Sequence, residues 1–197
     1  MPKLLIGITG ASGIAYSLRL LNYCDVISKK YKAIDAILTR SSLKVAKLEL
    51  GIELVEEIRK YNCIDGIYME DEIEAPISSS SNLVQYDGVI IPSSINTVAK
   101  LANGIQDNLL LRSFYGLLRL RRKIVIVVRE TPLSAIDLYN LYKLAKFGAV
   151  VLPASPGFYS KPSTIEDLLD FIVGKVFDVL GIPHEIYARW GKTRAMS

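Results

Sequence analysis

The chain has 197 residues, of which half are hydrophobic and 22% are charged, so it is long and apolar enough to bury the core of one domain. This composition excludes a disordered chain, and the longest aliphatic run, residues 124–128, is far shorter than the roughly 18 apolar residues of a membrane span. We therefore expect no membrane span, and we attribute the mean hydropathy of +0.28 to parallel strands that are buried on both faces.

The net charge of +4 and the isoelectric point near 9.0 are compatible with a nucleic-acid partner. The densest basic cluster consists of Arg119, Arg121, Arg122 and Lys123. Cations gather at the C-terminal ends of helices, where they suit the helix dipole, and no aromatic residues alternate with this cluster. We expect no nucleic-acid partner, whereas a small phosphorylated ligand would use the same surplus of positive charge.

The few cysteine and histidine residues bear on the compartment and on metal binding. Cys24 and Cys63 do not have the spacing of a metal site or a redox motif, which is typical of proteins in a reducing cytoplasm. The short apolar stretch at the N-terminus runs directly into glycines, so we expect no signal peptide and a cytoplasmic protein. A single histidine, His184, argues against a histidine-rich metal site, and we expect no bound metal.

The pattern along the chain alternates short aliphatic strands with amphipathic helices. In chain order, the apolar runs predict strands at residues 3–8, 33–38, 88–91, 123–128 and 149–152. Start and stop signals predict helices at residues 13–28, from Thr39, from Ser94 to Gly104, from Asp107, from Ser134 and at residues 164–180. This alternation is typical of a three-layer α/β domain with a mainly parallel sheet.

Local signals support several of these helix starts. Ser94 can cap its helix, and Ser134 with Asp137 and Thr164 with Asp167 resemble capping boxes in which aspartate replaces glutamate. In the last helix, apolar residues fall on one stripe at helical spacing, namely Ile165, Leu168, Leu169, Ile172, Val173, Val176 and Leu180. No repeat or linker divides the chain, so we expect a single domain over residues 1–197.

The first strand leads into a glycine-rich turn, GITGASG at residues 7–13. Glycines let the backbone approach a phosphate, and the helix N-terminus supplies free N–H groups, although the same residues also suit a plain tight connection. A short-chain dehydrogenase also begins with such a turn and has a Tyr-x-x-x-Lys pair, which Tyr139 and Lys143 match. That interpretation fails because Ala15 replaces a required glycine and no acidic residue ends the second strand.

Three later loops also follow expected strands, and in an open parallel sheet ligands bind at the carboxyl ends of the strands. The loop PSSINT places hydroxyl groups at a helix start. In RETP, Arg129 beside Glu130 is either a simple ion pair or a phosphate anchor beside a proton-transfer group. In PASPGFYSKP, the prolines hold Phe158 and Tyr159 on a stiff loop, where aromatic side chains often line a ligand.

Taken in order, these segments resemble the flavin prenyltransferases of the UbiX type, a branch of the flavoprotein family. The resemblance covers nearly the whole chain, from GITGASG to Ala188-Arg-Trp190, and RETPL and FYSKP are its most specific motifs. It implies a Rossmann-like (flavodoxin-like) domain that assembles into a homododecamer with its site between subunits. It also implies that a dimethylallyl group from dimethylallyl monophosphate is joined to N5 and C6 of reduced FMN. The product, prenylated FMN, would serve a decarboxylase of the UbiD type.

The resemblance also implies roles for individual residues. For FMN binding these are Gly10, Ala11, Ser12, Thr39, Ser94, Ile95, Asn96, Thr97 and Arg129. For the prenyl phosphate they are Arg119, Tyr159 and Lys175, and for catalysis Ser12, Glu49 and Glu130. Trp190 would belong to a tail, residues 182–197, that covers the site of a neighbouring subunit.

Three positions depart from the family pattern. Ser80 stands where glycine is common, Lys175 where an arginine commonly binds the prenyl phosphate, and Arg119 where lysine is common. The last two changes keep the positive charge, but a lysine does not offer the bidentate fork of arginine.

The implied mechanism stabilises the charge on the departing phosphate with Arg119, Lys175 and Arg129 rather than with a metal ion. Glu130 is the candidate acid for the leaving phosphate, and Ser12 is a candidate relay for the proton lost from C6. Two other classes remain open, a non-catalytic flavin carrier and an FMN-dependent peptidyl-cysteine decarboxylase. Such decarboxylases rely on a histidine after the first helix, and its absence there favours the prenyltransferase.

Overall fold

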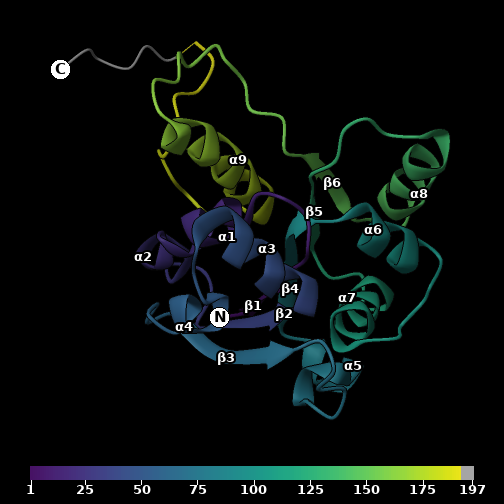
Figure 1. The fold of residues 1–197 in the computed structure, drawn as a ribbon. Helices are drawn as coiled ribbons and strands as arrows, with labels where there is room; N and C mark the ends of the chain where they lie inside the picture. Colours follow the sequence, from purple (N-terminus) through teal and green to yellow (C-terminus); the bar gives the residue numbers. More distant parts are fainter. Residues whose placement is uncertain (192–197) are drawn as a thin grey trace.

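A computed structural model describes residues 1–191 of the chain, and in it six parallel strands form one sheet (Figure 1). The strands are β1 (Lys3–Ile8), β2 (Ile34–Leu38), β3 (Ile64–Met69), β4 (Tyr86–Ser93), β5 (Ile124–Val128) and β6 (Val150–Pro153). Their order across the sheet is β3-β2-β1-β4-β5-β6, and each neighbouring pair is parallel. The chain thus builds outward from β1 to β3 and then returns to place β4 on the other side of β1. This reversal creates a switch point between β1 and β4, where ligands of such sheets bind.

Helices cover both faces of the sheet (Figure 1). One core cluster lies between the sheet and α1 (Ile14–Leu21), α2 (Cys24–Ile27), α3 (Arg40–Leu50), α4 (Leu54–Ile58) and α9 (Ile165–Leu180). The other lies under the 3₁₀ turn η1 (Pro76–Ser78), α5 (Ser80–Leu83), α6 (Ile95–Ala102), α7 (Leu109–Arg119) and α8 (Ala135–Lys146). Along β5, Val125 and Val127 pack in the first cluster, whereas Ile126 and Val128 pack in the second. Burial on both faces explains why this strand is apolar at every position.

The structure confirms the three-layer α/β fold and most of the predicted helix starts. Ser94 caps α6 by accepting a hydrogen bond from the N–H of Thr97 at 3.2 Å. Both predicted capping boxes are present, with Ser134 at the start of α8 and Thr164 at the start of α9. These signals are local, because the capping side chain bonds to the backbone only three residues away.

Two predictions about the first half of the chain are wrong. The helix expected at residues 13–28 divides into α1 and α2 at Tyr23, whose φ of −103° and ψ of 34° leave the helical region. The edge strand β3 has no counterpart in the predictions. Most of its residues are only half-buried, and Asp65 and Gly66 interrupt any apolar pattern.

Two further corrections concern the ends of helices. Asn108, not Asp107, caps α7, because its side chain accepts a hydrogen bond from the N–H of Leu111 at 2.9 Å. Ile165, which the helical spacing places on the apolar stripe of α9, is 70% exposed because it lies in the first turn of the helix.

The two cysteines are joined in a disulfide, which corrects the interpretation drawn from their spacing. Cys24 begins α2 and Cys63 directly precedes β3, and their Cα atoms are 5.6 Å apart, a usual separation for a bridged pair. Cysteine usage therefore no longer supports a reducing compartment, and a cytoplasmic location remains a prediction. In the described part of the chain, none of the helices combines the length and the apolar composition of a membrane span.

Candidate functional site

The switch point is held together by Thr9, the first residue after β1. Its hydroxyl donates a hydrogen bond to the carbonyl oxygen of Pro92 at 2.8 Å and accepts one from the N–H of Ser94 at 2.9 Å. Thr9 is buried, so both bonds are protected from water. It therefore ties the glycine-rich turn after β1 to the loop after β4. Sequence reasoning missed this residue, although its position as the first polar residue beyond a buried strand was a usable signal.

Backbone hydrogen bonds join the other strand ends to this point. The N–H of Thr39 donates to Ile8 at 3.1 Å, and the N–H of Arg129 donates to Ser93 at 3.2 Å. The predicted FMN-binding residues in all four loops consequently lie at one edge of the sheet. These are Gly10, Ala11 and Ser12 after β1, Thr39 after β2, Ser94, Ile95, Asn96 and Thr97 after β4, and Arg129 after β5.

Gly10 is required by the close approach of α3. A Cβ atom at this position would meet the Cβ and Oγ atoms of Ser41 at 2.5 Å, which is too short for real contacts. Thr39 begins α3 by accepting a hydrogen bond from the N–H of Ser42 at 3.1 Å, and its hydroxyl lies 2.9 Å from that of Ser41. The Ser41 hydroxyl is exposed beside the turn and was not among the predicted site residues.

Glu49 reaches from the end of α3 to the start of α1. Its carboxylate accepts hydrogen bonds from the N–H of Gly13 at 3.0 and 3.1 Å and from the N–H of Ile14 at 3.2 Å. Burial alone would raise the pKa of Glu49, but hydrogen bonds from the Ser12 hydroxyl and these N–H groups hold it below the usual value. Two of the three predicted catalytic residues are thereby brought together, because the Ser12 hydroxyl lies near enough to the Glu49 carboxylate to help lower its pKa.

Arg129 carries the clearest indication that a ligand binds at this edge. Among the described residues, its Nε and the hydroxyl of Ser93 are the two buried side-chain polar atoms without a hydrogen-bond partner. A buried donor without a partner costs about 1–3 kcal/mol, so such atoms are rare unless a ligand satisfies them. The positive charge of Arg129 also lowers the pKa of Glu49 and opposes the burial that raises the pKa of Tyr16.

An anionic flavin such as FMN fits this arrangement. Arg129 offers an unused donor, and Gly10 lets the backbone lie close to a ligand at a switch point. Glu130, the third predicted catalytic residue, follows Arg129 and is exposed, with its carboxylate accepting a hydrogen bond from the N–H of Thr131 at 3.0 Å. It lies at the same edge of the sheet but takes part in a local contact only.

Two of the predicted prenyl-phosphate residues belong to a cluster around α9. The ring of Tyr159 lies edge-on to Phe171 with centroids 5.8 Å apart, and the Lys175 ammonium lies 5.4 Å from the centroid of Phe171. A hydrogen bond to Tyr187 raises the pKa of Lys175, and burial only partly opposes it, so this side chain is a cation. Lys175 is therefore half-buried and held, rather than a freely solvated surface lysine.

Arg119, the third of them, does not join this cluster within one chain. It ends α7, where its guanidinium lies 5.4 Å from the centroid of Tyr115, and it lines a groove of about 780 Å³ with Arg121, Arg122 and Lys143. This groove is at the amino edge of the sheet, because α7 leads into the start of β5, whereas Arg129 follows its end. The five residues of β5 separate the two edges by roughly 16 Å. A contact between Arg119 and the site remains a prediction that needs a second copy of the chain.

The predicted tail is described as far as residue 191. Within one chain, Trp190 packs edge-on against Tyr159 with centroids 5.1 Å apart. Residues 192–197 of the predicted tail lie outside the described residues. Whether the tail covers a neighbouring subunit remains a prediction.

Comparisons with known proteins agree with this geometry. The family model described as Flavoprotein matches residues 1–177. A flavin prenyltransferase UbiX from Saccharolobus solfataricus is 46% identical over 189 residues, which cover 95% of this chain and 92% of the relative. The structure of AnUbiX in complex with FMN and dimethylallyl pyrophosphate has a TM-score of 0.88 and 28% identity, covering 98% of this chain and 99% of that one.

A dodecameric FMN-dependent UbiX-like decarboxylase from Escherichia coli O157:H7 is also similar in structure. Its TM-score is 0.87 at 29% identity, and the match covers 96% of this chain and all of the other (100%). Sequence similarity of this extent, on a fold that places the shared motifs at one switch point, is not explained by a common architecture alone. The chain belongs to the flavoprotein family, and within it to the flavin prenyltransferases of the UbiX type.

Proposed function

We propose that this protein joins a dimethylallyl group from dimethylallyl monophosphate to N5 and C6 of reduced FMN. The observation that carries the proposal is the buried Nε of Arg129, which has no partner at the switch point, where its positive charge and the Ser12 hydroxyl both lower the pKa of Glu49. The near full-length similarity to a flavin prenyltransferase UbiX supports the same conclusion. Prenylated FMN would then be delivered to a decarboxylase of the UbiD type.

The residues at the switch point would hold and orient the flavin. Gly10, Ala11 and Ser12 would contact it through the turn after β1, with Thr39 beside them. From the start of α6 it would be contacted by Ser94, Ile95, Asn96 and Thr97. The buried Nε of Arg129 would donate a hydrogen bond to the ligand. When bound, the reduced flavin supplies the nucleophilic nitrogen and the ring carbon that accept the prenyl group.

The chain's own residues would manage charge and protons around the prenyl phosphate. The cations Lys175 and Arg119, with the hydroxyl of Tyr159, would stabilise the charge that builds on the departing phosphate without a metal ion. Glu130 would protonate the leaving phosphate oxygen as the allylic C–O bond breaks. Ser12, bound to the ionised Glu49, would pass on the proton that is lost when the ring closes.

An assembly of several copies would complete the site. Arg119 lies at the opposite edge of the sheet from Arg129, so it would contact the prenyl phosphate of a neighbouring copy. The outer face of α8 and the residue that follows the helix also expose large apolar side chains, with Ile136 73%, Tyr139 62% and Phe147 61% exposed. Such a patch suits a protein interface, and the dodecameric relative from Escherichia coli gives a precedent for the assembly.

Anaerobic incubation with reduced FMN, dimethylallyl monophosphate and EDTA tests the proposal. Mass spectrometry of the released flavin should show a gain of one C5 prenyl unit. An unchanged flavin mass on a protein saturated with FMN would leave a flavin carrier as the function. Oxidation of a peptidyl-cysteine substrate in a parallel reaction would identify a decarboxylase instead. If turnover required added Mg²⁺, only the proposal that the reaction needs no metal ion would be contradicted.

A further inference from the structure

The carboxylate of Asp178, in the last turn of α9, collects hydrogen bonds from three residues of the segment that follows the helix. Arg189 donates to Oδ1 at 2.7 Å and to Oδ2 at 3.2 Å, and the Tyr187 hydroxyl donates to Oδ2 at 2.6 Å. The His184 Nε2 atom lies 3.0 Å from Oδ1. One acidic side chain thus binds the chain at three points over residues 184–189.

Asp178 is well suited to this role because it remains ionised while partly buried. Its side chain is 28% exposed, and that of His184 is 1% exposed. Burial by itself would raise the pKa of Asp178, but hydrogen bonds from Arg189, Tyr187 and His184 lower it to about 2. Hydrogen bonds to an ionised acceptor are roughly twice as strong as neutral ones, so the contacts form a stable anchor.

Burial of apolar surface does not hold the end of this segment. Ile182 and Tyr187 are buried, but Arg189 and Trp190 beyond them are exposed, Trp190 by 80%. The segment runs back along α9 toward the loop that precedes the helix (Figure 1). There Trp190 meets Tyr159. The position of Trp190 therefore depends on Arg189 and its ion pair with Asp178.

A second connection leads from Asp178 to Lys175. The Tyr187 hydroxyl donates to Asp178, and the same residue is the main cause that raises the pKa of Lys175. The Lys175 ammonium lies 5.0 Å from the centroid of the Tyr187 ring. Gly174 makes this contact possible, because a Cβ atom there would collide with the Tyr187 ring.

We propose that Asp178 is a positioning residue. It fixes the position of the Lys175 side chain through Tyr187, and it fixes the position of the Tyr159 ring through Arg189 and Trp190. Because its carboxylate is occupied by residues 184–189, we assign it no contact with the substrate. The part of this inference that concerns the prenyl phosphate rests on the proposed function. The anchoring of the segment 184–190 stands on the contacts alone.

The Asp178→Asn variant tests the proposal, because it keeps the size of the side chain and removes its charge. Trp190 is the single tryptophan of the chain, so its fluorescence anisotropy reports on this segment without a label. We expect lower anisotropy, a KM for dimethylallyl monophosphate raised tenfold or more, a kcat within a few-fold of the parent, and unchanged FMN affinity. Parent-like anisotropy and KM would overturn the proposal, and lower anisotropy with a parent-like KM would reduce Asp178 to a structural anchor.

Two further variants separate the connections and remain informative if Asp178→Asn folds poorly. Arg189→Met should lower the anisotropy of Trp190, because it removes the ion pair that holds the end of the segment. Tyr187→Phe should leave the anisotropy near that of the parent and still raise the KM, because it removes only the hydroxyl by which Asp178 holds the ring beside Lys175. Identical effects of both variants on both measurements would contradict the two separate connections.

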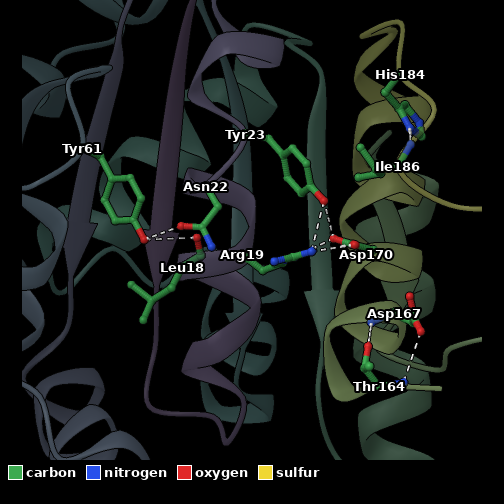
Figure 2. A network of polar contacts seen from close by, with 10 residues as sticks. All are labelled: Leu18, Arg19, Asn22, Tyr23, Tyr61, Thr164, Asp167, Asp170, His184 and Ile186. Atoms are coloured by element: carbon green, nitrogen blue, oxygen red, sulfur yellow. Dashed lines mark hydrogen bonds and ion pairs between the residues drawn. The ribbon is translucent and has the colours of Figure 1, made fainter. Parts of the chain in front are cut away.

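Asp170→Asn is the matched control on the same helix. Asp170 also binds an arginine, accepting hydrogen bonds from Arg19 at 2.6 and 2.7 Å and from the Tyr23 hydroxyl at 2.7 Å (Figure 2). This network joins α1 to α9 and does not include the segment after α9, so the anisotropy and KM should stay at parent values. If the parent protein does not prenylate FMN, the proposed function fails, while the anisotropy of Asp178→Asn still decides whether Asp178 anchors the segment.

Discussion

At the scale of single residues, the site is marked by polar atoms that the folded chain does not satisfy by itself. The Nε of Arg129 is buried at the end of β5 without a partner, whereas the Glu49 carboxylate accepts hydrogen bonds from the N–H groups of Gly13 and Ile14. An unsatisfied buried donor lowers the stability of the protein without ligand and is recovered when a ligand accepts its hydrogen bond. We therefore expect Arg129 to lower the stability of the protein without ligand and to raise its affinity for the ligand.

Replacing Arg129 tests this expectation. Arg129→Met keeps an unbranched side chain but removes the charge and the unpaired donor. Loss of a charge-assisted contact of about 1.5–3 kcal/mol predicts a 10- to 150-fold rise in the Kd for FMN. The melting temperature without FMN should be equal to or higher than that of the parent. Isothermal titration and thermal unfolding measure the two effects.

Arg59→Met is the control for the loss of an arginine. Arg59 is an exposed residue that pairs with Glu56 at 2.5 Å, and it lies outside the site. Its removal should leave the Kd for FMN unchanged. A drop in melting temperature without ligand for Arg129→Met, with a parent-like Kd, would show that Arg129 serves the fold instead.

At the scale of elements, α9 links stability to the site. Its start is held by the capping box of Thr164 and Asp167, its C-terminal half carries Lys175, and its last turn carries Asp178. Along its length, Arg19 and Tyr23 bind it to the first helices (Figure 2). The helix is therefore fixed at both ends and in the middle, as a rigid support for the residues around it.

Removal of the cap at Thr164 should destabilise the protein modestly. Thr164→Ala removes the side chain that accepts a hydrogen bond from the N–H of Asp167 at 3.1 Å. The expected loss is about 1 kcal/mol, which lowers the melting temperature by about 2–4 °C. Ser134→Ala at the equivalent box of α8 should have a similar effect. A melting temperature unchanged by Thr164→Ala, measured by calorimetry, would mean that packing of α9 alone sets its start.

At the scale of the whole molecule, different features lie at the two edges of the sheet. The carboxyl edge carries the predicted flavin site, whereas the amino edge carries the groove around Arg119 and the disulfide of Cys24 and Cys63. The disulfide bridges residues that are 39 positions apart in the sequence. By closing this loop it restricts the unfolded chain and stabilises the fold without touching the site.

Reduction of the disulfide should lower the melting temperature and leave FMN binding intact. For a loop of this length the chain-entropy model gives about 4 kcal/mol, which corresponds to a decrease of about 10 °C. The double variant Cys24→Ser, Cys63→Ser should melt at the lower temperature with or without reductant. Equal melting temperatures of the parent with and without reductant, when titration finds two free thiols after reduction, would contradict this stabilising role.

Much of the local structure could be predicted because its causes lie within a few residues. Apolar runs predict the buried strands such as β5, and the capping side chains Ser94, Ser134 and Thr164 bond to backbone only three positions away. The loops after β1, β4 and β5 could be assigned to one site, because parallel strands end at the same edge. The edge strand β3 escaped prediction because one side of it has no neighbouring strand and its residues are mixed in polarity.

The sequence by itself determined the α/β class, most of the helix caps and the loops of the predicted flavin site, since these depend on short-range hydrogen bonds and on burial patterns. Only the tertiary structure decided which distant residues meet. It placed Glu49 on the N-terminus of α1, joined Cys24 to Cys63, and anchored residues 184–189 on Asp178. It also placed Arg119 at the opposite edge of the sheet from Arg129. Such contacts depend on the packing of whole elements, and neither spacing nor local propensity encodes them.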